Sequence, residues 1–445
     1  MGQIKVDIKV SADLTYTFIE EDNLIEGFGL SRKMDSNISA LCGEIECGEV
    51  NLTLSNLFNE FNILSTAAVY SQIKNGQELK IYSITDAGTY TLFTGYIVDF
   101  IAPTSTDTQS CNVRAVDRLH ALLNTDITVK TELQVEKGLT LSAYFSKLFG
   151  AYGLTAEDYE LDTDLEQIIL DYALVVGKSL SEQLNEVCKA VDCYIYVNRV
   201  GRIIVKAKTI TGTAVKTYTR DDGSLISSEY GYSLFSSCNA LKVGYVAAMV
   251  SEVKSILVVD SQSVQPGDNI FDNFELGISN LYELDSIRVT SQSDTVLTSL
   301  SATASTISFV LNNPTDAEDI VSIEVYGKTV ETADAFVVKS VDTEQTEQSI
   351  EVKSLLVQQR EYAEKLAEKL YVRASQPIPY ITAEVEVVDF AVDLGYIVSV
   401  VDSEADFTYT GYIHSIDIEY DGQGYAFYTL GIRALYEEVV DNGAD

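Results

Sequence analysis

The 445-residue chain has no tryptophan, two histidines and five prolines. Because His120 and His414 lie far apart in the sequence, chemistry that needs several histidines at once, such as most catalytic zinc sites, is nearly excluded. Basic residues are also scarce: 30 Lys and Arg stand against 67 Asp and Glu, a net charge of −37. Such a surface repels phosphate backbones and argues against ordinary DNA or RNA binding.

Long apolar runs are absent as well. No stretch approaches the roughly 18 uncharged apolar residues of a membrane span, so we expect no membrane-spanning segment. The first residues enter a strand-like alternation directly, and we expect no secretory signal. Hydrophobic residues make up 46 % and charged residues 22 %, which excludes a disordered or collagen-like chain. At about 100–200 residues per domain, the length predicts two to four domains.

Cysteine spacing excludes the common metal and redox motifs. Two pairs have four residues between their members, Cys42/Cys47 and Cys188/Cys193, and neither has CxxC spacing. The remaining two, Cys111 and Cys238, stand alone. Most of the six lie in apolar or alternating stretches, so we expect buried free thiols made in a reducing cytosol, with metal or disulfide roles as the alternatives.

The first 125 residues predict one compact β domain. Apolar residues from Ile4 to Val10 alternate with polar ones, as in a half-buried strand. Similar short stretches follow at regular spacing, and a short helix-like segment closes the series at 117–123. This pattern is typical of a barrel or a sandwich.

Residues 126–215 predict a small α/β insertion. The apolar spacing after Gly138 is helical, and Ser179 with Glu182 forms a capping box before a second helical stretch. Two apolar runs around the turn at 198–201 then predict a hairpin.

The remaining chain divides into two predicted parts. Residues 216–354 are β-rich and unusually rich in Ser, Thr and Asp. Residues 355–445 begin with a long amphipathic helix, from about Leu355 to Arg373, and continue as strands with period-two alternation.

An internal repeat links the two ends of the chain. Three landmarks recur in the same order: Gly76, Thr94-Gly95-Tyr96-Ile97 and Val113-Arg114-Ala115 match Gly395, Thr410-Gly411-Tyr412-Ile413 and Ile432-Arg433-Ala434. We therefore expect a mainly β (α+β) fold with duplicated β-barrel domains, an α/β insertion and a further β-rich segment. Because the second copy is short, it is expected to borrow strands from the segment after Lys216.

Candidate catalytic groups are weak. Close carboxylates could serve glycoside hydrolysis, but with 67 acidic residues such pairs arise by chance and are expected on a solvated surface; they are Asp162/Asp164, Asp221/Asp222 and Asp417/Glu419. A Cys111–His120 nucleophile and base is disfavoured by the turn of chain between them. His414 is expected on a strand, facing solvent or an interface. We predict no enzyme, no catalytic residue, no cofactor and no metal site.

The order of these motifs resembles the hub proteins of bacteriophage baseplates and tail tips. The segment Leu92–Ile97 followed by Val113–Leu119 is similar to that family's F-x-G-x-I … I-x-A-x-D-x-L pattern. The stretch from Leu180 to Ile203 resembles its central helix-then-hairpin module, and Cys238–Val243 and Ile323–Lys328 resemble β elements that follow. The likeness covers nearly the whole chain, which ends soon after the second repeat without a fibre or lytic extension.

The resemblance implies a structural protein of the virion. In that family a homotrimer presents six similar domains, and this ring joins a sixfold tail tube to a threefold tip and lets DNA pass. The implied partners are a distal tail or tube protein and a tip, spike or fibre protein. The implied location is the phage tail, assembled in the host bacterial cytoplasm.

A second reading treats the chain as a carbohydrate-binding module of a tail tip. Its 27 tyrosines could stack sugars, although tyrosine is also common in strands and at protein interfaces. Exposed tyrosines gathered around one groove would favour the sugar reading. Tyrosines along subunit borders would favour the hub.

Overall fold

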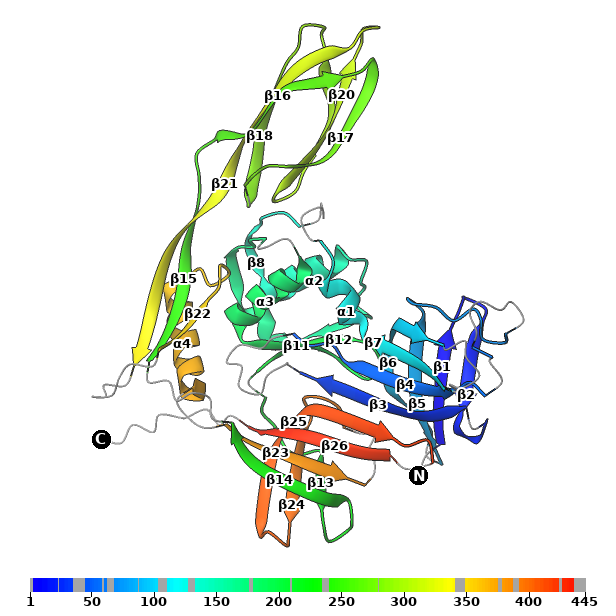
Figure 1. Cartoon of the computed structure of the whole chain (residues 1–445). Helices are drawn as coiled ribbons and strands as arrows, with labels where there is room; N and C mark the ends of the chain where they lie inside the picture. Colours follow the sequence, from blue (N-terminus) through cyan, green and yellow to red (C-terminus); the bar gives the residue numbers. More distant parts are fainter. Residues whose placement is uncertain are drawn as a thin grey trace, which may run out of the picture.

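The computed structural model is mainly β, as the sequence predicts (Figure 1). It describes residues 3–22, 24–34, 45–57, 60–61, 68–86, 88–102, 110–126, 133–175, 179–208, 210–233, 240–278, 280–340, 349–374, 378–386, 392–423 and 426–435.

One 13-stranded sheet contains both ends of the chain. Its strands are β1 (Gln3–Lys9), β2 (Thr15–Ile19), β3 (Ile25–Lys33), β4 (Glu49–Ser55), β5 (Glu78–Thr85), β6 (Gly88–Ile101), β7 (Ser110–Val116), β13 (Lys216–Thr219), β14 (Leu225–Ser233), β23 (Ile378–Val385), β24 (Ile397–Asp402), β25 (Phe407–Tyr420) and β26 (Ala426–Ala434). The main path runs β14-β23-β26-β25-β3-β4-β7-β6-β5-β1-β2, with β24 between β25 and β13. Alternate residues of these strands fill a single core, as in β1, where Ile4, Val6 and Ile8 are buried.

The α/β insertion lies against this sheet. It contains β8 (Lys137–Thr140), α2 (Leu141–Gly150), β9 (Tyr159–Leu161), β10 (Ile169–Tyr172), α3 (Leu180–Val191), β11 (Cys193–Val197) and β12 (Ile203–Ala207), with a short 3₁₀ turn at Thr163–Gln167. The helix α1 (Arg118–Leu123) precedes the insertion and packs into its core, and a second 3₁₀ turn, Glu20–Asp22, follows β2. The predicted capping box and hairpin are both present. Every residue of β11 is buried, because Tyr194 and Tyr196 face the large sheet while Ile195 and Val197 face the helices.

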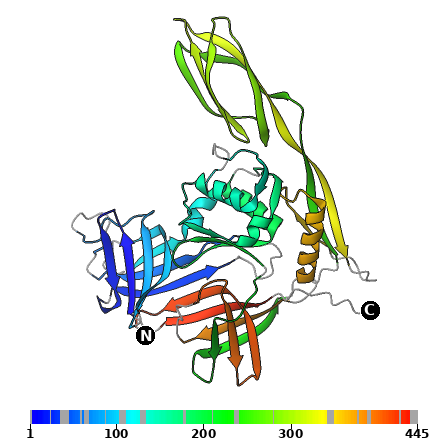
Figure 2. The ribbon, with the colours of Figure 1, turned by 180° about the vertical axis from the view of Figure 1, so that it is seen from behind.

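The β-rich segment forms an arm on a stalk. The arm strands are β16 (Lys254–Val264), β17 (Gly267–Glu275), β18 (Leu281–Thr290), β19 (Val296–Ala302), β20 (Thr306–Asn313) and the first half of β21 (Asp319–Ser340). The stalk consists of the second half of β21, which pairs with β15 (Ala240–Val250), and of β22 (Ser349–Lys353), which also pairs with β15. The arm has its own apolar core and projects away from the large sheet, as both views show (Figures 1 and 2).

Two placements differ from the segment boundaries that the sequence indicates. The strands β13 and β14 follow Lys216 but pair with β24 and β23, so the second copy does borrow them. The long helix α4 (Arg360–Ala374) begins about five residues later than expected and packs on β15 and β21 of the stalk. Its apolar stripe, which includes Leu366 and Leu370, joins the core of the insertion.

Candidate assembly interface

The two sequence copies have the same strand order. The first copy runs β3-β4-β7-β6-β5-β1, and the second runs β14-β23-β26-β25-β24-β13. Corresponding strand pairs are antiparallel in both copies, except that β13 pairs with β24 in parallel. The copies do not close separately, because β3 of the first copy pairs with β25 of the second.

The Thr-Gly-Tyr-Ile motif has the same backbone hydrogen bonds in both copies. Gly76 donates its N–H to the carbonyl of Ile97 at 2.7 Å, and Gly395 donates to Ile413 at 2.8 Å. Both glycines have positive φ, 86° and 78°, which explains the choice of glycine there. A β-bulge follows the isoleucine in each copy. These shared details confirm that Gly76, Gly95 and their counterparts occupy equivalent positions.

Close backbone approach explains the glycine inside the motif. A Cβ on Gly95 would lie 2.4 Å from the carbonyl oxygen of Val116, and one on Gly411 would lie 2.1 Å from that of Arg433. Arg433 therefore corresponds to Val116. The sequence match of Arg433 with Arg114 is wrong by two residues. Arg114 pairs with Asp99, the residue after the bulge in the first copy, and in the second copy the residue after the bulge, Ser415, pairs with Gly431. Gly431 is therefore the counterpart of Arg114.

The junction between the copies is a strand pairing sealed by a buried ion pair. The N–H of Met34 donates to the carbonyl of His414 at 3.0 Å, and six residue pairs follow along β3 and β25. Arg32 on β3 reaches the loop before Gly395, where its guanidinium lies 2.7 Å from the carboxylate of Asp393. Both side chains are almost fully buried.

The equivalent of β3 in the second copy is β14, and its outer edge is open. Each residue of β3 corresponds to the residue of β14 whose number is 200 higher, as their pairing with β4 and β23 shows. Both strands have a bulge at the same place, near Glu26 in β3 and near Ile226 in β14. Within the described chain β14 pairs with β23 alone. An open edge presents unpaired backbone N–H and C=O groups, which favour pairing with another strand.

Side-chain exposure differs sharply between these equivalent strands. Leu30 and Arg32 on β3 are 2 % and 5 % exposed. Their counterparts on β14, Tyr230 and Tyr232, are 48 % and 58 % exposed. By the equivalence of the registers all four lie on the same face of the sheet. β3 is paired with β25 on its outer side and Arg32 is covered by Asp393, whereas β14 has no second strand among the described residues.

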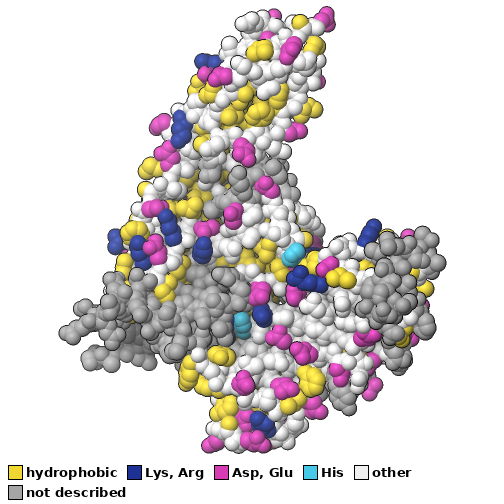
Figure 3. Space-filling model, viewed as in Figure 1, with side chains coloured by type: hydrophobic (Ala, Val, Ile, Leu, Met, Phe, Trp, Pro, Cys, Tyr) yellow, Lys and Arg dark blue, Asp and Glu magenta, His cyan; other side chains and the backbone are white. Residues whose placement is uncertain are grey.

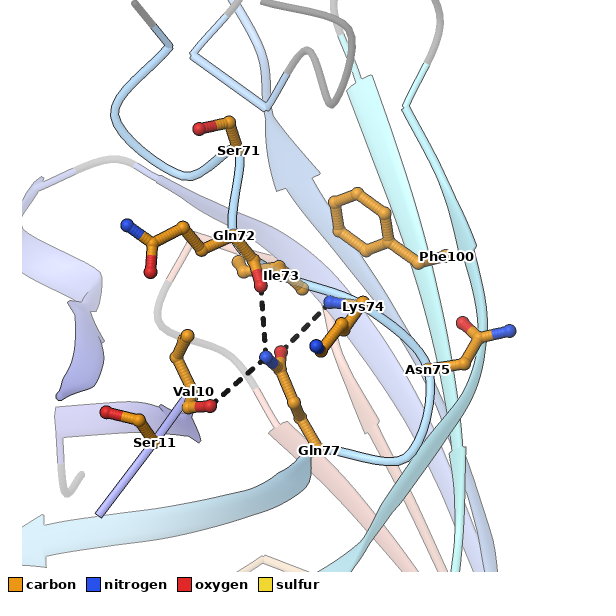
Figure 4. A pocket seen from close by; sticks show the side chains of 9 residues that line it. All are labelled: Val10, Ser11, Ser71, Gln72, Ile73, Lys74, Asn75, Gln77 and Phe100. Carbon is orange, nitrogen blue, oxygen red and sulfur yellow. Dashed lines mark hydrogen bonds between the residues drawn. The ribbon is translucent and has the colours of Figure 1, made fainter. Parts of the chain in front are cut away.

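The equivalent of β25 in the first copy is β6. Among the described residues, the end of β6 after Tyr96 pairs with β7 alone, so its other side is a second open edge. Asp99 and Ile101 are exposed there, although Asp417, the counterpart of Ile101, is partly covered by β3. On the inner side Phe100, the counterpart of Ile416, lines a pocket of about 720 Å³ (Figure 4).

Gln77 organises one wall of this pocket. Its side-chain amide donates to the carbonyls of Val10 and Gln72, and its oxygen accepts the N–H of Lys74 at 2.9 Å (Figure 4). The other lining residues are Ser11, Ser71, Ile73, Asn75 and Phe100. By the Gly76/Gly395 equivalence, Lys74 occupies the place that Asp393 has in the second copy. No ion pair of the Lys74 ammonium occurs among the described residues.

The histidines and cysteines do not form a nucleophilic site in the described chain. His120 lies on α1, whereas Cys111 is buried in the core of the large sheet, where burial raises the pKa of its thiol to about 12. His414 lies on strand β25, as expected; of the two expected surroundings, solvent or an interface, solvent is wrong, because the residue is 6 % exposed at the bulge of β25 and its ring lies against Tyr194 of the insertion. The described cysteines, Cys47, Cys111, Cys188 and Cys193, are free thiols. Cys42 and Cys238 lie outside the described residues.

The close carboxylates act as local caps or strand side chains. Asp162 caps a 3₁₀ turn, Asp222 accepts the N–H of Ser224 at 2.9 Å, and Asp417 and Glu419 stand on β25. No group of three His, Cys, Asp or Glu side chains that could hold a metal occurs in the described ranges. No helix there is long and apolar enough to span a membrane.

Asp117 is the D of the I-x-A-x-D-x-L pattern, but the sequence assigned no role to its side chain. Asp117 caps α1 and also accepts the N–H of Gly48, so it ties the insertion to the first copy. Burial raises its pKa to about 7, although hydrogen bonds from Gly48 and Leu119 oppose the shift. Its position directly after β7 and before an apolar helix is a signal of N-capping, but the sequence does not show its burial.

Two of the exposed tyrosines lie at a sheet edge, on β14, and a third, Tyr396, lines a pocket with Tyr196 and Lys206 of the insertion. Among the described residues only Tyr230, Tyr232 and Tyr396 are more than a third exposed. Tyr230 and Tyr232 meet edge to face, with ring planes at 86° and centroids 5.1 Å apart. Tyr230 and Tyr232 thus stand together on the edge strand β14 rather than around one groove.

Comparisons with solved structures agree with the fold. The chain resembles the 43 kDa tail protein of prophage MuSo2 from Shewanella oneidensis, with a TM-score of 0.55 and 11 % identity over 97 % of this chain and 98 % of that one. It also resembles a tail protein from Neisseria meningitidis MC58, with a TM-score of 0.54 and 10 % identity over 98 % and 97 % of the two chains. No protein-family model and no curated protein sequence matches. The likeness to tail proteins predicted from the sequence is thus confirmed for the fold.

Proposed function

We propose that this chain is a structural hub of a phage tail baseplate or tail tip, and that three copies form a ring of six similar units. One ring would then join a sixfold tail tube to a threefold tip and let DNA pass. The fold shared with two tail proteins supports the tail role.

One observation supports the proposed ring of six similar units. Within one chain the second copy joins the first through β25 and β3, while among the described residues β14 and the last residues of β6 lack the equivalent second partner. If β6 of one chain pairs with β14 of the next chain as β25 pairs with β3, both edges gain a partner strand and the exposed Tyr230 and Tyr232 become buried. Such a head-to-tail contact either closes into a ring or continues as a filament. The threefold closure is the part that rests on the family resemblance.

The proposed hub has a defined location and defined partners. The hub would be part of the virion, assembled in the bacterial cytoplasm with a distal tail or tube protein on one side and a tip, spike or fibre protein on the other. It would have no catalytic role. Carboxylates scattered over the surface would keep DNA from adhering during passage (Figure 3).

Mass photometry at micromolar concentration tests the ring. We expect a species of three times 48.9 kDa, and negative-stain images with threefold symmetry. A strict monomer at every concentration, an open filament, or six copies of the chain in one ring would contradict the proposal.

A further inference from the structure

We infer that the pocket beside Gly76 is the socket for Tyr232 of a second copy of this chain, and that β6 of one subunit pairs with β14 of the next in one defined register. This inference deepens the proposed hub function and rests on it. The intrachain junction supplies the geometry, and the two open edges supply the residues.

The register follows from the equivalence of the copies. In the intrachain junction Ser415 pairs with Lys33 and Ile416 with Arg32. Their counterparts at the open edges are Asp99 with Ser233 and Phe100 with Tyr232. The β14 edge and the exposed end of β6 are separated by seven strand spacings along the sheet of one chain, about 4.8 Å each along the hydrogen-bonding direction. The partner of each edge is therefore another copy.

In this pairing the side chain of Tyr232 enters the pocket beside Gly76 of the neighbouring chain. Around Arg32 the intrachain junction gathers Val392, Asp393 and Ile416. The equivalent residues of the first copy are Ile73, Lys74 and Phe100, and all three line the 720 Å³ pocket (Figure 4). A phenol entering there packs its ring on Ile73 and Phe100.

Lys74 then provides the polar contact. An ammonium can bind an aromatic face or donate a hydrogen bond to a phenol oxygen. The interchain junction thus replaces the Arg32–Asp393 ion pair with a lysine and a tyrosine.

This exchange of side chains also selects the correct partner strand. If β3 of another copy paired with β6, Arg32 would face Lys74, and like charges brought together in an interface oppose association. If β14 paired with β25, Tyr232 would leave the carboxylate of Asp393 without its guanidinium. Each strand therefore fits one socket, and the two copies alternate around the ring.

Disulfide trapping tests the register. Asp99→Cys with Ser233→Cys substitutes two positions that are paired in the inferred register, so mild oxidation should yield covalent oligomers that end at a closed trimer. Asp99→Cys with Glu229→Cys is the matched control, because position 229 lies on the same strand and the same side but four residues away. The wild type and the single variants report cross-linking by native cysteines.

A charge exchange tests the socket. Tyr232→Arg faces Lys74 with a like charge and should weaken trimer formation about tenfold or more. Adding Lys74→Asp rebuilds the Arg32–Asp393 arrangement at the interchain junction and should restore trimers. Phe427→Ala removes a similarly exposed aromatic ring from β26 and should leave assembly unchanged.

The outcomes separate the inference from the function on which it rests. Trimers that form without the 99–233 cross-link, or that ignore Tyr232→Arg, would overturn the socket and leave the hub proposal standing. Equal cross-linking of the 229 control would overturn the register. A chain that stays monomeric and uncross-linked at high micromolar concentration would overturn both.

Discussion

Arg32 and Asp393 are 361 residues apart in sequence, yet their side chains form a buried ion pair with an N–O distance of 2.7 Å. The pair fixes the loop before Gly395 to strand β3 and so joins the two copies of the repeat. Asp393 also accepts the backbone N–H of Arg199, which brings the hairpin turn of the insertion to the same point.

Removing the guanidinium should therefore destabilise the folded chain. Arg32→Met leaves the carboxylate of Asp393 buried without its partner, and we expect a loss of about 3–5 kcal/mol in unfolding free energy. Arg114→Met is the matched control, because its pair with Glu49 is exposed on the same sheet and contributes about 0–1 kcal/mol. Urea unfolding measures both, and equal losses would contradict the assignment.

The motif glycine of the second copy should not accept a side chain. Because a Cβ on Gly411 would meet a backbone oxygen at 2.1 Å, Gly411→Ala should cost roughly 1–3 kcal/mol. Gly29→Ala on β3 meets nothing within 4 Å and should be tolerated. Thermal unfolding compares the two, and a neutral Gly411→Ala would contradict the close approach.

Asp117 should make stability depend on pH. Burial raises its pKa from 3.8 to about 7, so the folded chain holds this proton more tightly than the unfolded chain. The stability from this group is complete below about pH 4 and is lost as the pH rises through about 7. The difference in unfolding free energy between wild type and Asp117→Asn should accordingly fall from pH 5 to pH 8.

Asp222→Asn is the control for that series. Hydrogen bonds from Ser224 lower the pKa of this exposed carboxyl, so its titration is finished below pH 5. Its difference from wild type should stay flat over the same range. A flat Asp117→Asn difference would show that the carboxyl titrates normally.

Free DNA should not bind the purified protein. With a net charge of −37, the surface repels the phosphate backbone, and low salt strengthens that repulsion. We expect no gel shift of duplex DNA at low ionic strength. A discrete shifted band that disappears as salt is added would reveal a basic contact and contradict passage without adhesion.

Hydrolytic activity should also be absent. Zymograms on peptidoglycan and a panel of glycans should stay blank, because His120 and Cys111 lie in different environments and the close carboxylates serve as caps and strand side chains. A lytic band that is lost when His120, His414 or an aspartate pair is substituted would show that the chain is an enzyme.

Local sequence patterns predict local structure well in this chain. The capping box at Ser179, the hairpin at 198–201 and the glycine landmarks of the repeat all depend on a few neighbouring residues, and all are present. Period and turn chemistry act over short distances, so they can be identified without knowing the partner strands.

The pairing of strands that lie far apart in the sequence was harder to predict. The Arg114 and Arg433 landmarks differ by two positions because β-bulges shift the register, and nothing in either tripeptide marks a bulge. The pocket beside Gly76 could not be found from the sequence because its equivalent is the junction where Arg32 of the first copy meets Asp393 of the second. An alternating strand shows which face it buries, but not which strand it pairs with.

The strand β21 has a mechanical consequence. Thr329 is paired in the arm and Val330 is paired in the stalk, so no unpaired residue of β21 separates the two. A hinge at this point would have to break ladder hydrogen bonds, which a flexible linker avoids. The continuous strand would therefore transmit a load at the tip of the arm, as a lever does, to the helix α4 that packs on it.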